Sequence, residues 1–265
     1  MSIQTSVRPF IAGAAGVASL YGLARLLLSF RKTPTNSNTP QPIGRSPNSP
    51  ELTVIPNKKS LEKISEIREL IATSGLSKEV LLKIRDTQVE LLIEDFTLTL
   101  AESRKIRKKY VTDLMEYDRE LIKFEKEMIA LWEASFQFIC AKLRLDPQEV
   151  RQFDEKFTGD TKLQKRVLTQ LYAARSLDNV SKETLEKIID YMIAEIEKLP
   201  EKNFQRANSL DTARAKLEFA ADLAFFKFNQ DPLKALANKD LTKEPELKRK
   251  IEKLAILLGI DRDNL

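Results

Sequence analysis

Apolar side chains recur along most of the chain at the spacing of one helical face. Between Leu82 and Phe138, alternating steps of four and three residues give seventeen positions, of which thirteen are apolar or aromatic. A repeat sustained over so many heptads is typical of a helix that packs along one face. Neither glycine nor proline interrupts the interval between Gly75 and Pro147. The pattern predicts one very long helix, with room for roughly 100 Å at about 1.5 Å per residue.

The C-terminal half of that helix carries a second apolar stripe, and the N-terminal half carries only the first. A helix that is apolar over a wide arc is covered on more than one side, as in a helical bundle. The narrower stripe can face a partner protein, a second copy of the chain or another helix. The second stripe consists of Val111, Met115, Ile122, Ile129, Trp132, Phe136 and Ile139. The seam expected to face a partner lies in the N-terminal half and consists of Leu82, Val89, Ile93 and Phe96.

Between the two halves lies the only dense basic cluster downstream of residue 57, formed by Arg104, Lys105, Arg107, Lys108 and Lys109. A bend or break of the long helix is expected at this point. The cluster has two interpretations: contact with anionic lipid or RNA phosphates, or a solvated helical stretch balanced by the acids that follow. The second is favoured, because no aromatic residues interleave with the charges.

Capping signals predict several further helices. Ser60 and Gly75 bracket the first, and Ser77 begins the second. Asp-Pro pairs at 146–147 and 231–232 place proline at a first helical position. Other helices are expected from Ser181 to about Pro200, over 161–175, over 209–228 and over 243–258, with Gly259 as the stop. Only seven glycines are present, and four of them precede Arg45, so the fold class expected is all-α.

The segment from Pro9 to Phe30 carries a single charge, Arg25. It is long enough to cross a bilayer as a helix, for which about 20 residues suffice. The residues expected to form this single membrane anchor include Phe10, Gly13, Gly16, Gly22, Leu26, Leu27 and Leu28. A cleaved signal peptide or a mitochondrial presequence remains as the alternative, since no acid precedes Glu51. A mitochondrial membrane is therefore favoured over a bacterial inner membrane or another endomembrane. Flanking charge favours a body on the cytoplasmic or matrix side.

Residues 33–57 hold six of the eleven prolines together with many Ser, Thr and Asn, and they show no apolar periodicity. Such a composition predicts a disordered linker, because it offers too little apolar surface to offset the entropy of ordering. The expected organisation is an anchor or targeting segment over 1–32, a flexible linker over 33–57 and a helical bundle domain over 58–265.

Charge and composition exclude several kinds of chemistry. The net charge is +5 and the pI near 9.1, but residues 1–57 supply +4 of it, so the helical body is nearly neutral. The chain has no histidine and one cysteine, Cys140, which removes Ser-His-Asp and Cys-His pairs, the usual zinc ligand sets and any intrachain disulfide. Cys140 lies in an apolar run, where cysteine normally behaves as a small hydrophobe. A face of small and aromatic residues is also more typical of core than of a docking groove: Ala220, Ala221, Ala224, Phe225 and Phe228.

The function expected from these patterns is that of a non-enzymatic, membrane-anchored interaction or structural protein, such as an adaptor, tether or accessory subunit of a membrane complex. Partners are expected to be the membrane, through the N-terminal helix, and proteins or a second copy, through the long helix. No cofactor, nucleic acid or small-molecule substrate is expected. Two alternatives remain: a lipid-binding or membrane-shaping module that uses residues 104–109, and an enzyme that uses only carboxylate, lysine or tyrosine chemistry.

Overall fold

The computed structural model describes residues 56–156, 180–200, 204, 206, 209–237 and 243–259. Within these ranges the chain is all-helical, with eight α-helices and no strand, which confirms the predicted fold class. The predicted anchor residues, Phe10 to Leu28, lie outside the described residues, as do the linker before Pro56 and the helix expected over 161–175.

The first described helix, α2 (Lys58–Ser74), begins earlier than its sequence signal suggested. Asn57 is the N-cap, and its side-chain oxygen accepts hydrogen bonds from the backbone N–H of Ser60 at 2.8 Å and from the Ser60 hydroxyl at 2.9 Å. The prediction that Ser60 caps the helix is therefore wrong, because Asn57 already occupies that role one turn earlier. Gly75 ends the helix as predicted, at φ 67, a left-handed conformation in which a side chain would be strained.

The predicted very long helix is two helices, α3 (Lys78–Arg107) and α4 (Leu114–Leu143), each of 30 residues. The break lies at the 3₁₀ turn Lys108–Tyr110 and the residues up to Asp113, at and just after the basic cluster where the sequence allowed one. The Asp113 side chain accepts from the backbone N–H of Glu116 at 3.2 Å. This is the hydrogen bond that an N-cap residue makes, and together with Glu116 it forms the sequence pattern of a capping box. A new helix therefore starts where the apolar repeat alone predicted continuity.

The described residues fall into two compact units. The hairpin unit comprises residues 56–103 and 122–156, and the bundle unit comprises 104–121 and 180–259. The residues around the break, 104–121, belong to the bundle unit, and we call them the hairpin tip.

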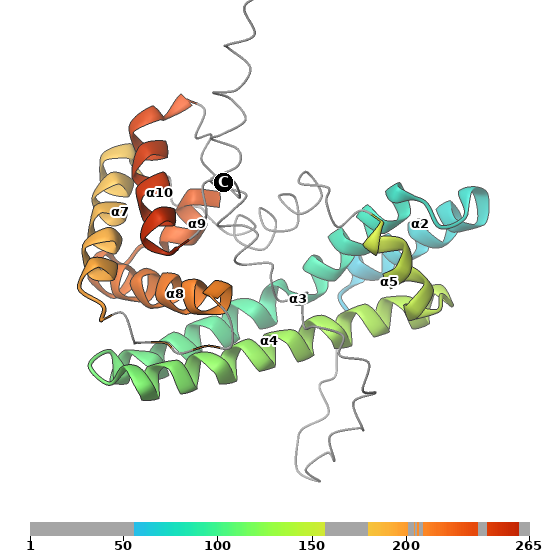
Figure 1. Ribbon diagram of the computed structural model, residues 1–265. Coiled ribbons are helices and arrows are strands. Elements are labelled where there is room, and N and C mark those ends of the chain that lie inside the picture. Colours follow the sequence, from blue (N-terminus) through green and yellow to red (C-terminus); the bar gives the residue numbers. More distant parts are fainter. Residues whose placement is uncertain are drawn as a thin grey trace, which may run out of the picture. The chain divides into compact units, whose positions relative to one another are not determined.

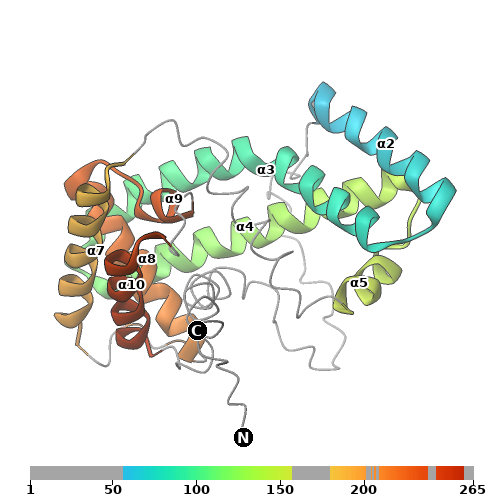
Figure 2. The ribbon, with the colours of Figure 1, turned by 90° about the horizontal axis from the view of Figure 1, so that it is seen from above.

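In the hairpin unit, α3 and α4 run side by side and return the chain on itself (Figures 1 and 2). The Gln88 amide, on α3, donates to the Trp132 carbonyl of α4 at 2.8 Å. Helix α2 and the short α5 (Pro147–Glu155) complete an apolar core that contains Ile67, Ile84 and Ile139. Cys140 is fully buried in this core, and burial raises the pKa of its thiol to about 11, which confirms its prediction as a core residue.

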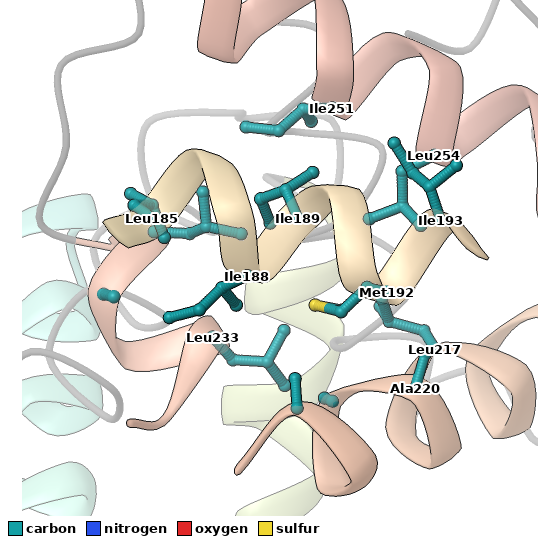
Figure 3. Packing of buried hydrophobic residues seen from close by; sticks show 14 of the residues in the cluster. Leu185, Ile188, Ile189, Met192, Ile193, Leu217, Ala220, Leu233, Ile251 and Leu254 are labelled. Atoms are coloured by element: carbon teal, nitrogen blue, oxygen red, sulfur yellow. The ribbon is translucent and has the colours of Figure 1, made fainter. Parts of the chain in front are cut away.

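In the bundle unit, α7 (Lys182–Glu197), α8 (Ser209–Phe228), α9 (Pro232–Ala237) and α10 (Pro245–Leu257) enclose a second apolar core. Figure 3 shows the buried residues of α7 between two groups, with Ile251 and Leu254 of α10 on one side and Leu233, Leu217 and Ala220 of α9 and α8 on the other. The predicted starts of α7 at Ser181 and of α8 at Ser209 are confirmed, and the proline pairs open α5 and α9 as predicted.

Candidate functional site

The strongest concentration of charge in the described interior lies where the hairpin tip meets α8. Arg104 and Arg107 stand one turn apart at the end of α3, so both point to the same side. Asp222, on α8, accepts from Arg104 Nε at 2.8 Å and from Arg107 Nε at 2.7 Å. All three side chains are buried. One carboxylate therefore bridges two guanidinium groups away from solvent.

Tyr117 and Asp231 extend this arrangement from two further elements. The Tyr117 hydroxyl, on the first turns of α4, donates to Asp222 Oδ2 at 2.7 Å. Asp231 caps α9, with Oδ1 accepting from the N–H groups of Leu233 and Lys234, while its other oxygen accepts from Arg104 Nη1 at 2.5 Å. The cap that starts a short helix thus also fixes the hairpin tip.

Aromatic rings close the space around these charges. The Tyr117 ring meets Phe219 edge to face at 4.9 Å between centroids and Phe204 at 6.2 Å. The Arg104 guanidinium lies 4.8 Å from the centroid of Phe225, a distance at which the ring face attracts a cation. The rings exclude water, which strengthens the attraction among the charges and raises the cost of any charge left without a partner.

Helix α8 is buried on several sides, and one of its buried faces carries charge. Arg214, Glu218 and Asp222 follow one another at intervals of four, so they share one helical face, and all three are buried. Ala220, Ala221 and Ala224 are fully buried in the apolar core instead, as predicted. We call Arg104, Arg107, Tyr117, Glu218, Asp222 and Asp231 the ionic cluster.

Burial and neighbouring charge together shift the pKa values of several members of this cluster. Burial disfavours the charged form of Arg104, but the Asp231 and Asp222 carboxylates outweigh it and raise the pKa above its ordinary range. Burial and the Asp222 charge raise the pKa of Tyr117, so this phenol is protonated and donates. Burial, followed by Asp222, raises the pKa of Glu218 to about 7 against the opposing pull of the arginines. Glu218 is the member that titrates near neutral pH.

The ionic cluster holds the hairpin tip, α8 and α9 together through hydrogen bonds and ion pairs. Its described carboxylates accept hydrogen bonds from arginine or lie beside it, and no group of three potential ligands among the described residues is arranged to hold a metal ion. A buried network of this kind contributes little net free energy over an apolar core, but losing one member is costly because the remaining charges stay buried. It fixes how the hairpin tip sits on α8.

A smaller buried charge pair lies in the hairpin unit. Arg85 Nη2 donates to Asp154 Oδ2 at 2.5 Å, and Arg85 Nη1 donates to Gln88 Oε1 at 2.8 Å. The pair joins α3 to α5, and the Arg85 guanidinium lies 5.6 Å from the centroid of the Phe136 ring.

The structure divides the predicted basic surface into two sets. Arg104 and Arg107 are buried and paired with carboxylates, so neither the favoured prediction of a solvated stretch nor the alternative of contact with an anionic surface describes them. The acids expected to balance them from downstream are also not their partners, since Asp222 and Asp231 take that role. Lys105, Lys108 and Lys109 are exposed.

The predicted seam residues lie on α3 in the hairpin unit with mixed exposure. Val89 is buried, whereas Leu82, Ile93 and Phe96 are half-buried, and Leu82 packs against the apolar core of its own unit. Their role in binding a partner stays a prediction. In the part of the chain that is described, no helix is long and apolar enough to cross a membrane.

Sequence reasoning missed Asp222, Glu218, Tyr117 and Asp231 as members of one site. A signal for Asp222 was present: it interrupts the apolar run Phe219–Phe226, and an acid in such a run is buried and needs a cation. Its partners lie more than one hundred residues away, and no local spacing identifies them.

No protein-family model, curated protein or solved structure matches this chain. Neither a family nor a function is therefore transferred from a relative, and the chain's own residues carry the functional inference.

Proposed function

We propose that this protein is a membrane-anchored helical scaffold that holds protein partners near a bilayer and carries out no catalysis. The observation that carries the proposal is the ionic cluster, whose buried charges are directed at one another across the hairpin tip, α8 and α9. Charges used in this way fix one arrangement of helices, which suits a rigid platform.

The sequence supports the membrane part of the proposal. The apolar segment from Pro9 to Phe30 serves as a single-pass anchor, and residues 33–57 serve as the tether to the helical body. A mitochondrial membrane is the favoured location, because no acidic residue precedes Glu51.

The absence of histidine and the burial of the lone cysteine support a non-enzymatic role. An enzyme based on carboxylates would need a reactive carboxyl open to a substrate, and Glu218, whose pKa lies near 7, is enclosed by the other members of the ionic cluster. Its perturbed pKa therefore reflects neighbouring charge and burial.

Protein partners are proposed to dock on the half-buried residues of the α3 seam, Ile93 and Phe96. A second copy of the chain can occupy the same seam. The apolar character and partial exposure of these residues support a docking role.

Two measurements on the full-length chain test the proposal. Carbonate extraction of native membranes should leave the chain in the pellet, and its mature N-terminus should precede residue 33. Affinity purification followed by quantitative mass spectrometry should recover partners that the Ile93→Ser/Phe96→Ser variant loses at a temperature where circular dichroism shows both chains folded. Recovery of the chain in the carbonate supernatant would contradict the membrane anchor. An unaltered set of partners in the folded seam variant would contradict the docking role of the seam.

A further inference from the structure

The turn that joins α3 to α4 exposes two large apolar side chains on the bundle unit. Met115, on the first turn of α4, is 78% exposed, and Ile106, on the last turn of α3, is 41% exposed. Most large apolar residues near them in the sequence are covered, including Tyr117 and Leu121. Exposed apolar residues grouped at one turn mark a place of contact.

Lysines accompany these apolar residues on the same turn. The inward side of the last turn of α3 is fixed by Arg104 and Arg107, which reach Asp222. At about 100° per residue, helical geometry then places Lys105, Ile106 and Lys109 on the opposite side. Among the described residues, none of the ion pairs involves Lys105, Lys108 or Lys109, and Lys108 lies 5.4 Å from the centroid of the Phe226 ring.

This positive charge is offset in part by the four acids of the hairpin tip, Asp113, Glu116, Asp118 and Glu120. Asp113 is held at the N-terminus of α4 as its cap, and Glu116 forms an ion pair with Arg119 at 2.6 Å. The hairpin tip thus exposes three lysines as well as two large apolar side chains. That combination fits the boundary of an anionic bilayer, where apolar groups enter the headgroup region and lysines meet lipid phosphates and carboxylates.

We propose that the hairpin tip is a second membrane contact, which inserts Met115 and Ile106 into the headgroup region of a leaflet rich in anionic phospholipid. The inference rests on the proposed function in one respect, namely that the N-terminal segment holds the body near a bilayer. The anchor keeps the tip at high local concentration, so a contact that is weak by itself becomes populated. The body would then lie against the membrane at a defined point.

The experiment uses an environment-sensitive fluorophore on the full-length chain. Cys140 is buried and the pKa of its thiol is raised, so a Met115→Cys variant labels selectively at position 115. The labelled chain is reconstituted into vesicles of phosphatidylcholine alone or of equal parts phosphatidylcholine and phosphatidylserine, with bromine-labelled lipid as quencher. Ile256→Cys provides the matched control, because Ile256 is 45% exposed on α10 of the same unit.

We expect the label at position 115 to shift to the blue and to be quenched by brominated lipid only when phosphatidylserine is present. Each lysine near an anionic surface is worth roughly a fivefold change in partition. The Lys105/Lys108/Lys109→Gln variant, checked by circular dichroism for its helix content, should therefore reduce quenching at position 115 by at least tenfold. The label at position 256 should not respond.

Three results would overturn the inference. These are no quenching at position 115 in phosphatidylserine vesicles, equal quenching at position 256, and quenching that persists in the folded glutamine variant. A spectral shift at position 115 that RNA produces and phosphatidylserine vesicles do not would assign the tip to nucleic acid and would also overturn it. Carbonate extraction of the same preparations reports the N-terminal anchor independently, so failure of the tip and failure of the anchor are distinguished.

Discussion

The bundle unit and the hairpin unit both bury arginine, but they surround it differently. In the hairpin unit, Arg85 meets one carboxylate, Asp154, beside an otherwise apolar core. In the bundle unit, two arginines share Asp222, and Arg104 has Asp231 as a second partner. Both members of an isolated ion pair can be replaced by apolar side chains together, and no buried charge then remains. Replacing two members of a network leaves the other members buried without a partner. The comparison predicts that the two regions respond differently to mutation.

The largest effect is expected for Asp222→Ala. This change leaves Arg104, Arg107 and the Tyr117 hydroxyl buried without their shared acceptor. The free energy of unfolding should therefore fall by about 3–5 kcal/mol. Urea unfolding of the full-length chain in mild detergent, followed by circular dichroism, measures it.

The control for Asp222→Ala is Asp190→Ala, which removes an exposed partner of Lys250. An exposed pair of this kind should cost less than about 1 kcal/mol. Equal losses in the two variants would contradict the role of Asp222.

Exchanging the buried pair of the hairpin unit tests the difference between pair and network directly. Arg85→Met removes the guanidinium partner of the buried Asp154 carboxylate. This single change should cost about 3 kcal/mol. Adding Asp154→Leu should restore stability to within about 1 kcal/mol of the parent.

The corresponding exchange in the bundle unit, Arg107→Met with Asp222→Leu, should remain strongly destabilising, because Arg104 and Tyr117 still lose their acceptor. The same urea titrations measure all variants. If this double variant recovers as fully as the hairpin pair, the ionic cluster is only a set of independent pairs.

An intermediate effect with a defined pH dependence is expected at Glu218. Burial and the Asp222 charge raise the pKa of Glu218 from 4.5 to about 7 in the folded chain. The folded chain then holds this proton more tightly than the unfolded chain, so the stabilisation is present at low pH and is lost as pH rises from about 4.5 to 7.

The free energy of unfolding of the parent chain should accordingly fall by on the order of 2 kcal/mol between about pH 5 and pH 8, and that of Glu218→Gln should not show this fall. Urea titrations at both pH values measure the difference. Glu149→Gln, at an exposed position on α5, should keep the pH profile of the parent. A parallel pH profile for parent and Glu218→Gln would show that the neighbouring arginines hold Glu218 ionised throughout.

The smallest effect is expected on the outer side of the hairpin tip, where Arg119 forms an exposed ion pair with Glu116. Arg119→Ala should cost less than about 0.5 kcal/mol, because water and salt screen such a pair. Asp118→Ala, one residue earlier, should cost more, because Asp118 accepts from the largely buried Arg206 at 2.6 Å. Thermal melts of the two variants compare an exposed ion pair with a largely buried one on the same helical turn. A larger fall in melting temperature for Arg119→Ala than for Asp118→Ala would contradict this prediction.

Local signals in the sequence were sufficient for most helix ends. Gly75, Ser181 and the proline pairs act through neighbouring residues, so the boundaries they predict hold in the structure. The break in the long helix follows a local signal of the same kind, since Asp113 and Glu116 form the sequence pattern of a capping box.

The candidate site was not predictable from spacing, because its members come together only through tertiary structure. Arg104 and Arg107 look like part of a basic surface when Lys105, Lys108 and Lys109 are read beside them. Which of the five charges faces inward is decided by the side of the hairpin tip that packs on α8, and a charge run does not show which side that is. The isolated acid at 222 was the one local sign that a buried cation exists.

The ionic cluster also has a consequence for the order of events during synthesis. Arg104 and Asp222 are separated by 118 residues, and Tyr117 and Asp222 by 105. At about 5–20 residues per second, a ribosome needs on the order of 10 s to extend the chain from the first to the last of these residues. During that interval the hairpin tip has emerged while its acceptor has not been made. A chain that ends before residue 222 would leave Arg104, Arg107 and Tyr117 without their shared acceptor.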